Sequence, residues 1–162
     1  MKKFLSAFVL LCVGVFFVAT YVKHNTFKND YVAYEALQSQ ITKKYSEKGQ
    51  EILQRMATLQ KEQDAQLYKT LIFDSKKLMD DLSLELSEIK PQTEPIKKFN
   101  EFYIESTNSN KIAVVNLLNG MLTQDTAVVM QANQAIQNIE IELLKKKGAL
   151  QQSANTYEPF SF

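Results

Sequence analysis

An uncharged run of nineteen residues, Phe4 to Val22, follows Met1-Lys2-Lys3 near the N-terminus. An α-helix rises about 1.5 Å per residue, so this run gives roughly 28 Å of helix, close to the ~30 Å hydrocarbon thickness of a bilayer. Tyr21 falls at the interfacial position that aromatic residues prefer. The run therefore predicts a transmembrane helix over residues 4–22.

This segment is expected to be a retained signal-anchor. A cleaved signal has an apolar core of about 7–15 residues and small residues at positions −3 and −1 of its cleavage site. The one plausible cut, after Ala19, places the bulky Phe17 at −3. A cleaved signal is the alternative. Cys12 follows Leu10-Leu11, where lipid attachment needs a small residue, so we interpret Cys12 as an apolar residue of the span.

Charge indicates the orientation of the chain. Lys2 and Lys3 favour a cytoplasmic stub, residues 1–3, by the positive-inside rule. In a bacterium this makes the chain a single-pass protein of the inner membrane, with its N-terminus cytoplasmic and its bulk periplasmic or extracellular. Three of the 19 basic residues precede residue 25 and all 18 acidic residues follow it, which leaves 16 basic against 18 acidic. This balance argues against binding to nucleic acid.

The remainder of the chain has the composition of long helices. After residue 25, glycine occurs only at positions 49, 120 and 148, and proline only at 91, 95 and 159. Apolar residues recur at helical spacing, most regularly in one stripe near the C-terminus. Its members are Val129, Ala132, Ile136, Ile139, Leu143 and Leu150. We expect an all-α fold with an extracytoplasmic helical bundle over residues 25–152.

The helix breaks leave two architectures open. Pro91 to Pro95 cannot continue a helix, and Thr93 is placed to cap a new one near Glu94. Asn119-Gly120 followed by Asp125 indicates a further stop and start, whereas 61–66 is only polar. If both places bend, four antiparallel helices form a bundle; if neither bends, the chain is a long two-helix coiled-coil hairpin. The wide apolar face of residues 67–89 favours the four-helix bundle.

Catalytic and metal sites are not expected. His24 is the only histidine, so His-based catalytic or metal groups cannot be assembled in one chain. Asp81, Glu85 and Glu88 share a helix face, which we interpret as a solvated acidic surface; a hard-cation site is the alternative. Glycine-rich phosphate loops are absent. We therefore predict no enzyme activity, no metal and no cofactor.

The C-terminal region carries the candidate contact residues. Three consecutive lysines before Gly148 suit a helix C-terminus with glycine in a left-handed cap. Residues 153–162 are expected to be a flexible tail with three aromatic residues. The final helix should return toward the membrane, which places both features near lipid headgroups. The predicted contact residues are Lys145, Lys146, Lys147, Tyr157, Phe160 and Phe162.

Three classes of function fit this layout. The first is a non-enzymatic, membrane-anchored scaffold or adaptor of a cell-envelope complex, with membrane lipid and an envelope protein as partners and self-association also open. The second is an accessory subunit that senses a ligand in a bundle-core pocket; a pocket at the polar residues 106–110 would favour it. The third is a membrane-bridging or disrupting protein, because the layout resembles that of phage inner-membrane spanins. No motif assigns the chain to a family.

Overall fold

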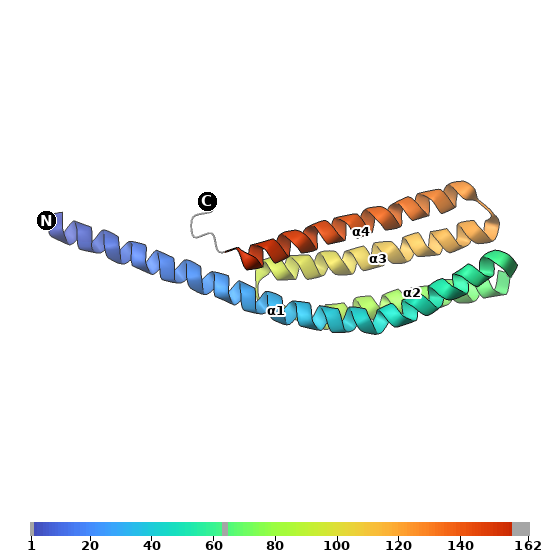
Figure 1. Ribbon diagram of the computed structural model, residues 1–162, viewed down its shortest axis with the longest axis horizontal. Helices are drawn as coiled ribbons and strands as arrows, with labels where there is room; N and C mark the ends of the chain where they lie inside the picture. Colours follow the sequence, from blue (N-terminus) through green and yellow to red (C-terminus); the bar gives the residue numbers. More distant parts are fainter. Residues whose placement is uncertain (1, 63–64, 157–162) are drawn as a thin grey trace.

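Four helices account for nearly all of the structure. The computed structural model describes the backbone of residues 2–62 and 65–156, and the side chains of residue 15, residues 18–58 and residues 65–156. The helices are α1 (Lys2–Glu62), α2 (Ala65–Glu88), α3 (Glu94–Thr123) and α4 (Thr126–Asn155). Figure 1 shows them running back and forth along one axis. The all-α prediction and the preferred four-helix bundle are confirmed, and the two-helix hairpin is wrong.

Helix α1 is one continuous helix of 61 residues. Its N-terminal part projects beyond the other three helices (Figure 1). Among the residues that the structure describes, no helix is long and apolar enough to cross a membrane. The predicted span, residues 4–22, is helical, but most of its side chains lie outside the described part. The structure thus supports the helical bundle and gives no support to the transmembrane part of the prediction.

The turn between α2 and α3 lies where the two prolines predict it. Thr93 has an extended backbone and occupies the N-cap position of α3, with Pro95 in the first turn. Its hydroxyl does not cap α3, however, and donates instead to Asp30 of α1 at 2.6 Å. The capping role predicted for the Thr93 side chain is therefore wrong, because the hydroxyl donates its hydrogen bond to a carboxylate of another helix.

The turn between α3 and α4 is displaced from the predicted glycine. Helix α3 continues through Gly120 to Thr123, and Gln124 takes the left-handed conformation with φ 58°. Asp125 caps α4 as predicted, accepting from the backbone N–H groups of Ala127 and Val128. Gly120 allows α4 to pack closely on α3, since a Cβ there would lie 3.0 Å from a Val128 methyl. Helix α4 also continues through Gly148, so the predicted left-handed cap at that glycine is wrong.

Two hydrophobic clusters hold the helices together. The first draws on all four helices and lies near the α2–α3 turn; its buried members are Tyr31, Tyr34, Leu86, Ile89, Ile96, Phe99, Tyr103 and Ala154. The second joins α1, α2 and α3 only, around Tyr68, Leu71 and Leu118. Helix α1 packs mainly on α2 and much less on α4. The bundle is therefore closed at one end and more open along α4 at the other.

The predicted inward stripe of α4 agrees with the structure. Ala132 is buried, and Val129, Ile136, Ile139, Leu143 and Leu150 are half-buried. On the other helices several large apolar residues face solvent: Leu37 is 49 % exposed, Phe73 65 % and Leu84 62 %. The last two belong to the apolar face predicted over residues 67–89. Gln38 is buried beside Leu37, with its side-chain amide directed at the Thr42 hydroxyl. Periodicity thus identified the helices better than their exact faces.

Candidate functional site

A cavity of about 230 Å³ opens between α2, α3 and α4 in the middle of the bundle. It is partly open to solvent, and its volume suffices for a benzene-sized molecule, which an enclosed apolar cavity of ~150 Å³ can hold. Apolar side chains from α2 and α4 form most of its wall, and α3 supplies the polar residues of the 106–110 segment. The lining residues are Met79, Leu82, Tyr103, Ser106, Thr107, Asn110, Ile136, Ile139, Glu140 and Leu143.

The polar lining comes from an uninterrupted stretch of α3. Ser106 and Thr107 are buried, and the Thr107 hydroxyl donates to the Tyr103 carbonyl at 2.9 Å. Asn110 Oδ1 is buried and receives no hydrogen bond from any described residue. A buried acceptor without a donor costs about 1–3 kcal/mol. The 106–110 segment is thus a polar layer in an unbroken helix, and Asn110 offers one acceptor to a guest molecule.

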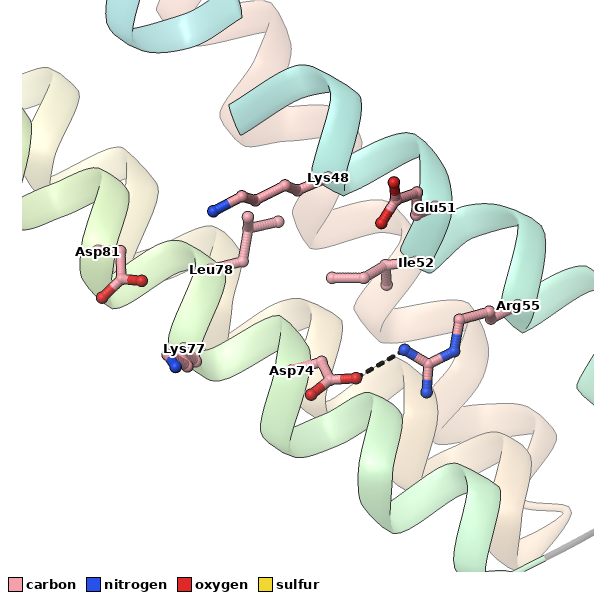
Figure 2. A pocket seen from close by; sticks show the side chains of 8 residues that line it. All are labelled: Lys48, Glu51, Ile52, Arg55, Asp74, Lys77, Leu78 and Asp81. Carbon is pink, nitrogen blue, oxygen red and sulfur yellow. Dashed lines mark hydrogen bonds and ion pairs between the residues drawn. The ribbon is translucent and has the colours of Figure 1, made fainter. Parts of the chain in front are cut away.

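A second concave surface, of about 270 Å³, lies between α1 and α2. Figure 2 shows four side chains of α1 facing four of α2: Lys48, Glu51, Ile52 and Arg55 opposite Asp74, Lys77, Leu78 and Asp81. The Arg55 guanidinium donates to the Asp74 carboxylate at 2.6 Å. Charges of both signs alternate along this groove and partly neutralise each other. We interpret it as an ionic strip between α1 and α2, because its charges pair across the two helices, as Arg55 and Asp74 do. Partly exposed pairs of this kind contribute only about 0–1 kcal/mol each.

The acidic face of α2 continues this strip. Lys44 and the Tyr45 hydroxyl both donate to the Glu85 carboxylate. The hydrogen bond from Lys44, followed by that from Tyr45, lowers the pKa of Glu85. Among the described residues, no group of three or more His, Cys, Asp or Glu side chains is placed to hold a metal ion. The arrangement at Glu85 thus joins two helices.

The three predicted contact lysines lie at the closed end of the bundle and face different neighbours. Lys146 Nζ sits 4.0 Å from the centre of the Phe102 ring, a cation–π contact between α4 and α3. Lys147 pairs with Glu35 of α1 at 3.8 Å. Lys145 is exposed and makes no ion pair with any described residue. Tyr157, Phe160 and Phe162 lie outside the described residues.

One residue that organises this end of the bundle is absent from the sequence-based prediction. Asp30 accepts from the backbone N–H groups of Gln92 and Thr93 and from the Thr93 hydroxyl. These partners lie 62 and 63 residues away in the sequence, so no local pattern points to them.

Comparison with protein-family models, with curated proteins and with solved structures found no match to this chain.

Proposed function

We propose that this protein is a non-enzymatic, membrane-anchored scaffold or adaptor subunit of a cell-envelope complex. One observation carries the proposal: the helix that begins at Lys2 enters the bundle without a break. Its described apolar side chains ahead of the bundle are exposed, with Val15 at 62 %, Val18 at 64 % and Val22 at 55 %. Apolar side chains that are this exposed to solvent favour contact with another apolar environment.

Continuity between anchor and bundle would fix the bundle relative to the membrane. The first side chain packed against the core is Phe27, only a few residues beyond the predicted span. A long α-helix is stiff, so the anchor and the four-helix bundle would tilt as one body. In a bacterial inner membrane with the N-terminus cytoplasmic, the bundle would stand in the periplasm. A scaffold benefits from holding its bundle at a fixed distance and angle from the membrane, whereas a soluble binding protein has no use for such a constraint.

The C-terminal end of α4 supports a membrane or partner contact through residues 145–162. Ala154 of α4 and Tyr31 of α1 belong to the same core cluster, so α4 ends beside the place where α1 enters the bundle. Figure 1 shows the C-terminal end of α4 close to the part of α1 that enters the bundle. Lysines near an anionic surface contribute about 1 kcal/mol each. Lys147, however, pairs with Glu35, which lies thirteen residues beyond the predicted span and so about 20 Å along α1 from it. A partner protein beside the bundle is therefore a nearer contact for Lys145 than lipid headgroups are.

Fractionation of cells tests the anchor. The full-length chain should stay in the membrane after carbonate washing, and protease added to spheroplasts should remove the bundle. The matched control is the fragment 25–162, which should be soluble and strongly helical. Full-length protein in the carbonate supernatant would contradict the anchor.

The contact of the C-terminal segment has its own test. An environment-sensitive dye on Ser161→Cys, in a Cys12→Ala background, should shift to the blue in anionic liposomes. The same dye on Asn116→Cys, near the opposite end of the bundle, should not. Equal spectra at the two positions, in liposomes and with co-purified partner, would argue against residues 145–162 as the contact.

A second function, ligand sensing, is favoured by the cavity between α2, α3 and α4. Its wall is mainly apolar, and Asn110 Oδ1 is an acceptor without a donor among the described residues. A compact, largely apolar molecule carrying one N–H or O–H group would satisfy both features. Indole and benzene are matched probes, because only indole donates a hydrogen bond. Indole should raise the melting temperature more than benzene, and Asn110→Leu should remove the difference; equal responses to both probes would exclude this role.

A further inference from the structure

Helix α4 carries a second stripe, on the side opposite its inward face. The stripe alternates steps of four and three residues, the spacing of a coiled-coil seam. We call it the outer seam: Met130, Gln134, Gln137, Ile141, Leu144, Gly148 and Gln151. Every member is exposed, and the three large apolar members are 70 %, 64 % and 62 % exposed, for Met130, Ile141 and Leu144.

The outer seam is uncharged along the whole of α4, on a chain that carries 37 formally charged residues among 162. A helix face that only meets water normally carries charged side chains. The glutamines and Gly148 do not prevent pairing. Gln134 donates to Asn138 at 3.0 Å and keeps its carbonyl oxygen as an acceptor, and a Cβ at Gly148 would meet nothing within 4 Å. A neighbouring helix could therefore approach the seam closely.

We propose that the outer seam binds the outer seam of a second copy of this chain, in a parallel two-helix coiled coil. In this register Ile141 takes position a and Leu144 position d, the combination that favours two parallel strands. Gln134 and Gln137 then face their own counterparts across the interface, where glutamine side chains donate to and accept from each other. Polar residues at such positions fix the register at some cost in stability.

Charge complementarity supports the second copy as the occupant. Glu140 precedes Ile141 at a g position, and Lys145 follows Leu144 at an e position. In a parallel dimer the g side chain of one helix meets the e side chain five residues further along the other, so Glu140 pairs with Lys145 of the second copy, twice by symmetry. Both residues are exposed, with Glu140 on the flank of α4 at the edge of the cavity, and neither makes an ion pair with a described residue of its own chain.

The antiparallel arrangement fits less well. It would set Glu140 against Lys147 of the second copy, and Lys147 already pairs with Glu35 in its own chain. The membrane favours the same orientation, a point that rests on the proposed function: two copies anchored through α1 in one bilayer present parallel α4 helices. Confinement to a membrane also raises the effective concentration, which helps a short interface with few apolar layers.

Disulfide crosslinking of the full-length chain, in membranes and in a Cys12→Ala background, tests the seam. Leu144→Cys lies at a core position of the proposed coiled coil and should form disulfide-linked dimers readily. Glu142→Cys, also exposed and two residues away, lies off the seam and is the control. A parallel dimer predicts crosslinking of Leu144→Cys with itself. Crosslinking only between Ile141→Cys and Leu144→Cys in co-expressed chains would indicate the antiparallel form and overturn the proposal.

Charge reversal provides a second, independent readout on the same chain. In the Glu140→Lys dimer, the new lysine of each copy faces Lys145 of the other, once on each side of the interface. The loss of two ion pairs and the added repulsion should weaken dimerisation about tenfold. Adding Lys145→Glu should restore it. No restoration, or equal crosslinking at Leu144→Cys and Glu142→Cys, would contradict the proposal. Carbonate extraction of the same samples reports the anchor separately, so the two proposals fail independently.

Discussion

The carboxylate of Asp30 in α1 holds the start of α3 through Thr93. Its Oδ2 atom accepts the Thr93 backbone N–H at 2.7 Å and the Thr93 hydroxyl at 2.6 Å. Both Asp30 oxygens also accept the Gln92 N–H at 3.0 Å. A negative charge at the N-terminal end of a helix is favourable because that end carries a partial positive charge. Asp30 thereby closes the bundle at the end where α1 enters it.

Asp30→Ala should destabilise the 25–162 fragment by about 1–2 kcal/mol, since hydrogen bonds to a charged group are lost at a helix start. Asn29→Ala, at the exposed neighbouring position, should change stability little. Urea unfolding followed by circular dichroism measures both. Equal midpoints for the two variants would show that the clamp on Thr93 contributes nothing.

The same carboxyl should make stability depend on acidity. Burial raises the pKa of Asp30, but hydrogen bonds from Thr93 and Gln92 outweigh it, so the pKa lies below its ordinary value of 3.8. A carboxyl with a lower pKa in the folded state contributes its stability above the ordinary pKa and loses it as pH falls through the folded one. Unfolding midpoints measured from pH 6 down to pH 2.5 should fall less steeply for Asp30→Asn than for the wild type.

Leu86 should be among the most costly residues to truncate. It is fully buried in the cluster shared by all four helices, whereas Leu84 on the same helix is 62 % exposed. Leu86→Ala should cost about 3 kcal/mol through lost burial and a residual cavity. Leu84→Ala should lie within about 0.5 kcal/mol of wild type. Chemical denaturation distinguishes them, and similar losses at both would mean that the faces of α2 are misassigned.

The two late glycines should respond to alanine in opposite directions. At Gly148 the helix continues and a Cβ meets nothing within 4 Å, so Gly148→Ala should stabilise the fold by about 0.5–1 kcal/mol. At Gly120 a Cβ would approach side-chain atoms of Val128 and Val129 to 3.0–3.1 Å. Gly120→Ala should destabilise by about 1–3 kcal/mol through overpacking. Thermal melts of both variants give the signs directly.

Local sequence rules predicted the helices well and their ends less well. Pro91 and Pro95 mark the α2–α3 turn because proline disfavours a helix interior whether it is buried or exposed. Glycine is weaker evidence, since its absent side chain serves either a turn or close packing. At Gly120 packing decides, and at Gly148 neither applies. Between Glu62 and Ala65 the sequence has no strong helix breaker, so local rules are compatible with both architectures.

The amino-acid sequence alone determined that this chain is helical, that the long helices turn at the prolines, and which face of α4 points inward, because these follow from backbone restrictions and periodicity within a few turns. Only the tertiary structure decided the partners of distant residues. Asp30 meets Thr93, Glu85 meets Lys44 and Tyr45, and Asn110 lines a cavity with α2 and α4. Such contacts depend on how four helices align in space, which no local spacing in the sequence encodes.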